Sequence, residues 1–358
     1  MSKKGGLSVF TEYIASNFIY AVDIPCQIVQ LGKYGNEFVD VIKDFTSGTE
    51  YTLHSFKETR QSSENTDISN KIYSYKDVEY LIEKHTKMSI DQIERSKRCF
   101  WDMFICDAIL GNRDRHKGNW GYLSNGINYS FAPLYDNGGC LFPDVNKQIN
   151  NFLVDKKSFL ESRIFTFPAS LFQLRRVIRN KESDYRTNYY EMFSDLRINK
   201  VFAERVRYFK SRYSYLDIFN IICSIVRPLG LSYEYTLFYI MITCLRYMCI
   251  VLRMDYNKAY NVVEGLINEI DECTPLILTP YLPPVCQADP SCPKCPKTPQ
   301  LPNLFHMHHY PLLLTYLYVP LYKLSKHFFE CRYMELFYGL VYLLAYYLLI
   351  SFIKPMYQ

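Results

Sequence analysis

A long stretch of apolar residues, bounded at both ends, constrains the fold of this chain more than any other feature. Ser89 and Gln92 have the spacing of a capping box, in which each side chain can satisfy a backbone N–H of the first helical turn. Gly111 supplies a stop, because glycine readily adopts the left-handed conformation in which many helices end. Between these signals, apolar residues follow helical spacing at Ile90, Ile93, Phe100, Trp101, Phe104, Ile105, Ala108 and Ile109. The sequence therefore predicts a long, buried helix over 89–111.

Local patterns predict further elements on both sides of this helix. Residues 7–25 show helical apolar spacing, and 26–31 and 37–42 are β-rich runs around the turn dipeptide Gly35-Asn36. We expect a helix followed by a β-hairpin. Other expectations are a surface loop in 46–73, short strands at 120–123 and 128–133, and helices through 150–273, with core helices rather than a membrane span at 235–252.

Composition changes abruptly after Cys273. Residues 274–304 hold nine of the seventeen prolines, which excludes a regular helix or central strand and predicts a linker. Beyond it, 336–353 is uncharged and close to the length of a membrane span, with a docked hydrophobic helix or a frame-shifted tail as alternatives. The predicted parts are a front region 1–85, a helical region 86–273, a linker 274–304 and a hydrophobic tail 305–358.

Overall composition excludes several classes of protein. A chain of 358 residues with 49% hydrophobic content can bury a sizeable core, so disorder throughout is excluded. The 41 Lys and Arg residues are interspersed with 36 Asp and Glu, and we expect no direct nucleic-acid binding. The scattered cysteines and the absence of a cleavable apolar segment after Met1 predict a cytoplasmic protein, with membrane contact only through 336–353.

The charged segment after the long helix carries the candidate chemistry. Asp114 is followed five residues later by Asn119, and Asp136 lies at a strand–turn boundary downstream. Carboxylate and amide oxygens suit Mg²⁺, and phosphoryl transfer needs mainly positioning and neutralisation of the phosphate charge. A loop Asp can face the acceptor hydroxyl while the Asn and the later Asp hold the metal. The spacing alone is equally typical of residues that cap a turn.

Longer motifs around these residues resemble those of a known family. The run Leu110–Gly121 resembles the catalytic loop of HipA-like serine/threonine kinases, and Ala132–Gly138 resembles their metal-binding segment. Upstream, Thr11–Ser16 and Val41–Phe45 match further landmarks, and Cys99–Phe104 resembles the short CtkA-type members. The resemblance implies an α+β, protein-kinase-like bilobal fold with an incomplete N-lobe and a mainly helical C-lobe.

The resemblance also implies roles for individual residues. Asp114 would be the catalytic base toward a Ser or Thr hydroxyl of a protein substrate, and Asn119 and Asp136 would bind the Mg²⁺ of ATP. His116 belongs to the same motif, either as a catalytic residue or as a residue that orders the loop by hydrogen bonding.

At the front of the chain, the resemblance implies residues that bind the nucleotide. Glu12 would match the helix glutamate that pairs with a nucleotide-binding lysine, and Lys43, Asp44 and Phe45 would lie on the strand that leads into the adenine-contacting hinge. An early acidic residue favoured by the helix dipole is the alternative for Glu12. Family members usually carry a Gly-rich phosphate loop and a strand lysine before this helix, where this sequence has Met1–Gly6. The alternative function is therefore a catalytically inactive, kinase-like binding module.

Overall fold

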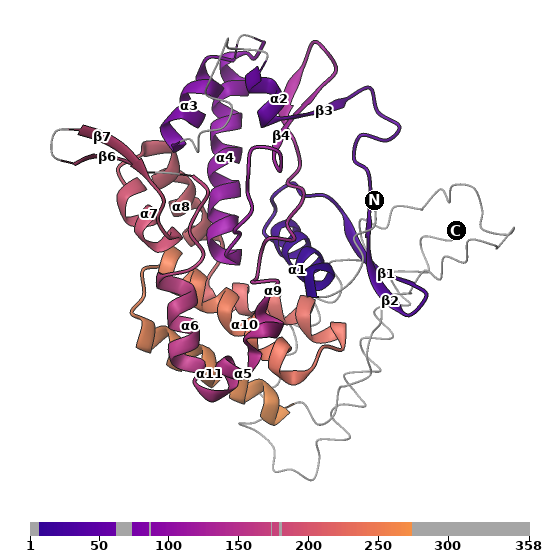
Figure 1. Cartoon of the computed structure of the whole chain (residues 1–358), viewed down its shortest axis with the longest axis vertical. Helices are drawn as coiled ribbons and strands as arrows, with labels where there is room; N and C mark the ends of the chain where they lie inside the picture. The colour runs from indigo at the N-terminus through magenta and orange to yellow at the C-terminus, as the bar shows by residue number, and fades with distance from the viewer. Residues whose placement is uncertain (1–6, 62–73, 86, 173, 179–180, 274–358) are drawn as a thin grey trace, which may run out of the picture. The chain divides into compact units, whose positions relative to one another are not determined.

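The computed structural model describes residues 7–61, 74–85, 87–172, 174–178 and 181–273 (Figure 1). The expected linker 274–304, the tail 305–358 with its apolar run 336–353, and Met1–Gly6 lie outside the described residues. Our division of the chain at these points stays a prediction.

Helix α4 (Ile90–Leu110) confirms the prediction drawn from the capping signals. The Ser89 hydroxyl accepts a hydrogen bond from the Gln92 N–H, and the Gln92 side chain accepts one from the Ser89 N–H. Gly111 is the C-cap, with φ of 63° in the left-handed region. The second half of α4, from Phe100 to Leu110, is almost wholly buried and forms the middle of the hydrophobic core.

A helix and a β-hairpin form the front of the described chain, as expected. Helix α1 (Leu7–Ala21) ends before the predicted residue 25. Strand β1 (Val29–Tyr34) pairs antiparallel with β2 (Glu37–Ile42) around Gly35, which has φ of 62°. The first strand begins later than predicted because Cys26 forms an isolated parallel bridge with Leu134, far downstream, instead of joining the hairpin.

A second sheet has the order β3-β4-β5, formed by β3 (Thr52–Ser55), β4 (Gly121–Ser124) and β5 (Tyr129–Phe131). The two later strands match the expected ones, but β3 and helix α2 (Phe56–Gln61) lie within the stretch 46–73 that we expected to hold a loop. That expectation is wrong for 52–61, because β3 depends on antiparallel pairing with β4 rather than on a local apolar pattern. A side chain at Gly121 would place its Cβ 2.1 Å from the carbonyl oxygen of His54, so the close approach of the strands requires glycine.

The remaining elements are mainly helical, as expected for 150–273. The helices are α3 (Tyr75–Glu83), α5 (Ile149–Val154), α6 (Lys156–Phe165), α7 (Tyr189–Leu196), α8 (Lys200–Arg212), α9 (Tyr215–Val226), α10 (Tyr233–Arg246) and α11 (Tyr256–Cys273), with shorter turns η2 (Val145–Lys147), η3 (Arg227–Leu229) and η4 (Tyr247–Val251). The hairpin of β6 (Leu174–Ile178) and β7 (Lys181–Tyr185) was not predicted. Helices α3, α8 and α10 pack on α4, so α4 is the centre of this helical body (Figure 1).

The apolar segment Tyr233–Val251 is long and apolar enough to cross a membrane by length and composition, and it is the one such segment within the described ranges. In the fold, 83% of its most apolar window is buried by other parts of the protein. Arg246 within it is fully buried and donates hydrogen bonds to backbone carbonyls of other elements. These contacts agree with the core helix expected at 235–252.

The two left-handed C-caps, Gly111 and Gly230, allow a matched test of how tightly the end of α4 is packed. An added Cβ at Gly111 would lie 3.3 Å from both Arg246 Nε and Phe142 Cε2, whereas an added Cβ at Gly230 would meet nothing within 4 Å. We expect Gly230→Ala to lower the free energy of unfolding by about 1 kcal/mol, through backbone strain alone. Gly111→Ala should lower it by about 2–3 kcal/mol, because its neighbours must also shift. Equal losses in urea denaturation would show that the end of α4 is loosely packed.

Candidate active site

A buried ion pair between α4 and the loop that follows it organises the candidate site. Asp107, in the last turn of α4, contacts Arg115 through both carboxylate oxygens, with an Nη2–Oδ1 distance of 2.9 Å and an Nε–Oδ2 distance of 3.0 Å. Both side chains are fully buried. Burial by itself would lower the pKa of Arg115, but the charge and hydrogen bonds of Asp107 outweigh it, so the pKa is raised and the guanidinium stays charged.

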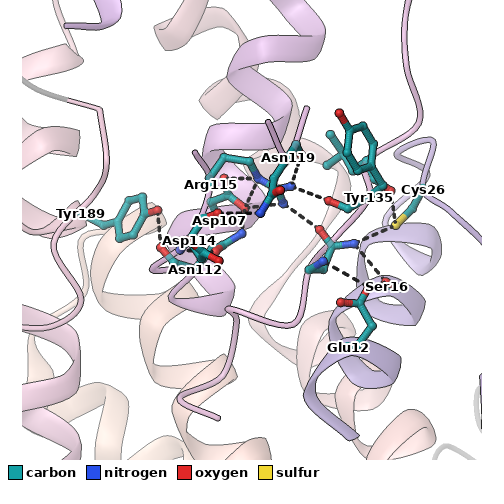
Figure 2. A network of polar contacts seen from close by, with 12 residues as sticks. Glu12, Ser16, Cys26, Asp107, Asn112, Asp114, Arg115, Asn119, Tyr135 and Tyr189 are labelled. Carbon is teal, nitrogen blue, oxygen red and sulfur yellow. Dashed lines mark hydrogen bonds and ion pairs between the residues drawn. The ribbon is translucent and has the colours of Figure 1, made fainter. Parts of the chain in front are cut away.

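Arg115 also joins the loop after α4 to the segment after β5. Its Nη1 donates to the carbonyl oxygens of Asn119 and Tyr135, each at 2.8 Å, and its Nη2 donates to Asn137 Oδ1 at 2.7 Å (Figure 2). The loop after α4 and the segment after β5 are therefore fixed against the same guanidinium. This arrangement brings the two sequence motifs together.

Hydrogen bonds within the loop set the backbone of Asp114. Asn112 Nδ2 donates to Asp107 Oδ1 at 2.9 Å, and Asn112 Oδ1 accepts from the Asp114 N–H at 2.8 Å. The Tyr189 hydroxyl donates to the Asn112 carbonyl oxygen at 2.7 Å from α7. Asp114 itself has an exposed side chain, as a group that must meet a substrate requires.

Asn119 lies at the far end of the same loop and is almost fully buried. Its Nδ2 donates to the Asp114 carbonyl oxygen at 3.0 Å, which holds the two residues at a fixed spacing. Its Oδ1, the atom with metal-ligand chemistry, makes no hydrogen bond to any residue in the described part of the chain. An amide oxygen of this kind is a ligand type that Mg²⁺ accepts.

Asp136 lies opposite this loop in a strained backbone conformation. Its φ is 54°, in the left-handed region that favours glycine, and its side chain is half-buried. Three residues on, Gly139 passes so close to the loop that an added Cβ would lie 2.7 Å from the Cβ of Asp114. The Gly139 carbonyl oxygen also accepts a hydrogen bond from the Arg113 N–H at 3.2 Å. Glycine at 139 is therefore what lets the two segments meet.

Asp114 and Asp136 line one cavity of about 640 Å³. Leu7 and Ser8 at the start of α1 line the same cavity, as do the cationic residues Arg113 and Lys147. Asn119 is not part of the lining, so only two of the three residues expected to hold metal and substrate face this space. No group of three or more His, Cys, Asp or Glu side chains that could hold a metal occurs within the described ranges. Two oxygen ligands from Asn119 and Asp136 would fit Mg²⁺, which usually keeps several waters.

His116 makes a hydrogen bond within the loop through its side chain. Its Nδ1 accepts a hydrogen bond from the Gly118 N–H at 3.0 Å, while its own ring is exposed. An added Cβ at Gly118 would lie 3.0 Å from the His116 ring, so the ring folds closely over this glycine. The backbone N–H of Asn119 donates to the His116 carbonyl at 2.9 Å, which links this turn to Asn119.

Glu12 is buried on α1 and reaches the segment that contains Asp136. Its Oε1 accepts hydrogen bonds from Gln27 Nε2 at 2.6 Å and from the Asn137 N–H at 3.1 Å. Among the residues that the structure describes, no Lys or Arg side chain forms an ion pair with Glu12, so the paired lysine that the resemblance implies has no counterpart there.

The residues expected beside the adenine lie outside the cavity that contains Asp114. They are Lys43, Asp44 and Phe45. The strand β2 ends at Ile42, so these residues begin the connection from β2 to β3 and are not on a strand as expected. The Asp44 carboxylate accepts hydrogen bonds from the Thr46 hydroxyl and N–H, which lower its pKa, and the Phe45 ring lies 6.2 Å from the Tyr135 ring. None of them lines the cavity that contains Asp114.

From the sequence we predicted no role for four residues of the site: Asp107, Arg115, Asn137 and Gly139. One signal was available for Asp107: a carboxylate in the last turn of an otherwise apolar helix is disfavoured by the helix dipole and must have a compensating partner. No local signal identifies Asn137 as the residue that connects α1 with Arg115, because its partners lie more than 20 residues away in sequence.

The site thus combines an exposed carboxylate and an amide on the loop after α4 with a half-buried carboxylate on the segment after β5. Against known proteins, the chain is 33% identical to the serine/threonine-protein kinase CtkA of Helicobacter pylori (strain J99 / ATCC 700824) over 187 residues, which are 52% of this chain and 54% of that protein. The aligned part therefore spans about half the length of this curated relative.

Among solved structures, a structure of CtkA also matches this chain. The crystal structure of the Helicobacter pylori proinflammatory kinase CtkA matches with a TM-score of 0.60 and 28% identity, over 75% of this chain and 91% of that chain. A complex of HipA and HipB with operator DNA from Shewanella oneidensis MR-1 matches with a TM-score of 0.35 and 11% identity, over 71% of this chain and 57% of that one. No protein-family model matches the chain.

The chain is therefore homologous to CtkA over about half of its length. The expected α+β, protein-kinase-like fold is confirmed by the match to CtkA. The individual site residues are tested by neither comparison and remain predictions.

The buried pair of Asp107 and Arg115 can be compared with an exposed pair in the same site. Arg113 and Asp144 form an ion pair of 2.6 Å, with about half of each side chain exposed. We expect Asp107→Ala to lower the free energy of unfolding by about 3–5 kcal/mol, because it leaves a buried guanidinium without its counter-ion. Asp144→Ala should lower it by less than about 1 kcal/mol, since solvent screens the exposed pair. Chemical denaturation of both variants checks this, and similar losses would contradict the central role of the buried pair.

Proposed function

We propose that this protein is a serine/threonine protein kinase that uses ATP and Mg²⁺. The observation that carries the proposal is the presence of Asp114 and Asp136 on one cavity, with Asn119 fixed to the Asp114 carbonyl. The homology to CtkA supports the same class of reaction. A protein with a Ser or Thr acceptor is the proposed partner, and the proposed location is the cytoplasm.

The residues of the chain divide the work of phosphoryl transfer. Asp114 accepts the proton of the Ser or Thr hydroxyl as that oxygen forms a bond to the γ-phosphorus and the bond to the ADP oxygen breaks. Asn119 and Asp136 would hold the magnesium ion, which neutralises phosphate charge when bound. His116 keeps the turn before Asn119 in place through Gly118.

The proposed place of the nucleotide base is beside the connection that follows β2. We propose that Lys43, Asp44 and Phe45 form the connection beside the adenine, since they link the α1 and β1–β2 region to the second sheet, where a hinge would be. The alternative function, an inactive kinase-like binding module, is favoured by Glu12, which forms no ion pair with a lysine within the described ranges.

Thermal shift and transfer assays together separate these functions. ATP with Mg²⁺ should raise the Tm of the wild-type protein, because a ligand at about 100 times its Kd adds about 2.7 kcal/mol of stability. Asp136→Ala should lose most of this shift. Asp114→Ala should keep it and lose about 100-fold or more of phosphate transfer to a protein substrate. A shift without any transfer by the wild-type protein would favour the binding module, and equal loss of nucleotide binding in both variants would contradict the assigned roles.

The two possible roles of His116 can be distinguished by the position of the replacement oxygen. Asparagine places an acceptor near the position of Nδ1, which receives the Gly118 N–H, whereas glutamine extends its acceptor toward the position of Nε2. If His116 orders the loop, His116→Asn should keep transfer within about fivefold of wild type, the effect of perturbing one hydrogen bond, and His116→Gln should lose more. Measured kcat values with the reverse order would assign His116 a direct role at its Nε2.

A further inference from the structure

Glu12 uses only one of its two carboxylate oxygens. Oε1 accepts hydrogen bonds from the Ser16 hydroxyl at 3.2 Å, from Gln27 Nε2 at 2.6 Å and from the Asn137 N–H at 3.1 Å. Oε2 is buried and has no hydrogen-bond partner in the described part of the chain. All the hydrogen bonds that this carboxylate accepts from the described residues therefore end at Oε1.

Asn137, the backbone partner of Glu12, has every polar side-chain group engaged. Its Nδ2 donates to Ser16 Oγ at 3.0 Å and to Cys26 Sγ at 3.4 Å, and its Oδ1 accepts from Arg115 Nη2 at 2.7 Å (Figure 2). The side chain is fully buried. Asn137 thus connects α1 to the guanidinium that holds the catalytic loop.

These bonds surround the strained residue Asp136. The Asn137 N–H that Glu12 binds belongs to the peptide unit directly after Asp136, whose φ is 54°. On the next residue, the Gly138 carbonyl accepts a hydrogen bond from Thr11 Oγ1 at 3.2 Å, also from α1. A non-glycine residue keeps a left-handed conformation only when its surroundings fix it. Here Thr11 and Glu12, adjacent residues of α1, make the hydrogen bonds that fix this conformation.

We infer that Glu12 is the positioning residue of the Asp136–Gly138 segment, acting through the hydrogen bonds that its Oε1 accepts rather than through its charge. Asn137 also accepts a hydrogen bond from Arg115, and this bond links the position of the segment to that of the catalytic loop. The direction of the Asp136 carboxylate then depends on where α1 lies. This inference rests on the proposed function only for the role of Asp136 in binding MgATP, since the hydrogen bonds themselves are independent of it.

Substitution of Glu12 by glutamine distinguishes the effect of the hydrogen-bond acceptor at Oε1 from the effect of the negative charge. Glu12→Gln keeps an oxygen at Oε1 and changes only Oε2, the atom that has no hydrogen-bond partner, while Glu12→Ala removes the acceptor. Glu12→Gln buries an additional N–H₂ group, so its Tm will fall whichever role is correct. Ile14→Val, a buried change on the same helix that touches none of these bonds, serves as the control for loss of stability alone.

The first measurement needs no nucleotide. Hydrogen–deuterium exchange of the Asn137 amide should stay close to wild type in Glu12→Gln and Ile14→Val, and should be about fivefold or more faster in Glu12→Ala, because that amide loses its acceptor. Equal acceleration in Glu12→Gln and Glu12→Ala, beyond that in Ile14→Val, would overturn the inference.

The second measurement is the Mg²⁺ concentration that gives half of the ATP-induced thermal shift. Wild type, Ile14→Val and Glu12→Gln should agree within about twofold, and Glu12→Ala should require about fivefold more Mg²⁺ or more, because Asp136 is no longer held. A purely structural role would leave this concentration unchanged in every folded variant and would also overturn the inference. If wild type shows no ATP-induced shift, the proposed function fails, and the amide exchange still decides the role of Glu12.

Discussion

The ion pair of Asp107 and Arg115 is the interaction on which the rest of the site depends. Moving two charges out of water is unfavourable, and their attraction compensates only where the geometry is close and the remaining polar atoms are satisfied. Here the carboxylate also accepts from Asn112, and the guanidinium also donates to the carbonyls of Asn119 and Tyr135. Because each partner would be left charged and buried without the other, the helix end, the loop and the segment after β5 form one unit.

A second buried arginine stabilises the same helix end from the other side. Arg246 donates from Nε to the Ala108 carbonyl at 2.8 Å, where α4 has its negative dipole end, and burial lowers its pKa to about 10. The glycines at 111 and 139 complete the arrangement, because a side chain at 111 would crowd Arg246 and a side chain at 139 would collide with Asp114. The loop that carries Asp114 is therefore positioned by packing and charge beneath it, and Asp114 itself remains exposed to solvent.

The front of the chain joins this unit through α1. In a kinase-like fold the helix glutamate is expected to meet a lysine, whereas here the described partners of Glu12 are a glutamine, a serine and a backbone amide. The homology to CtkA and the shared fold relate the protein to this class of kinase. The hydrogen bond between Glu12 and Asn137 connects α1 to the segment that contains the residue proposed to bind magnesium.

The sequence by itself determined the elements whose signals are local. The capping box of α4, its glycine stop and the hairpin around Gly35 follow from local patterns. Asp114, Asn119 and Asp136 were candidates because the motifs around them resemble those of a known family. Only the tertiary structure decided which of these residues meet. Strand β3 exists through pairing with β4, and Asn137 reaches Glu12 across 125 positions of sequence. Such contacts leave no periodic or capping pattern, because their stability comes from burial and hydrogen bonding between segments that approach only when the chain folds.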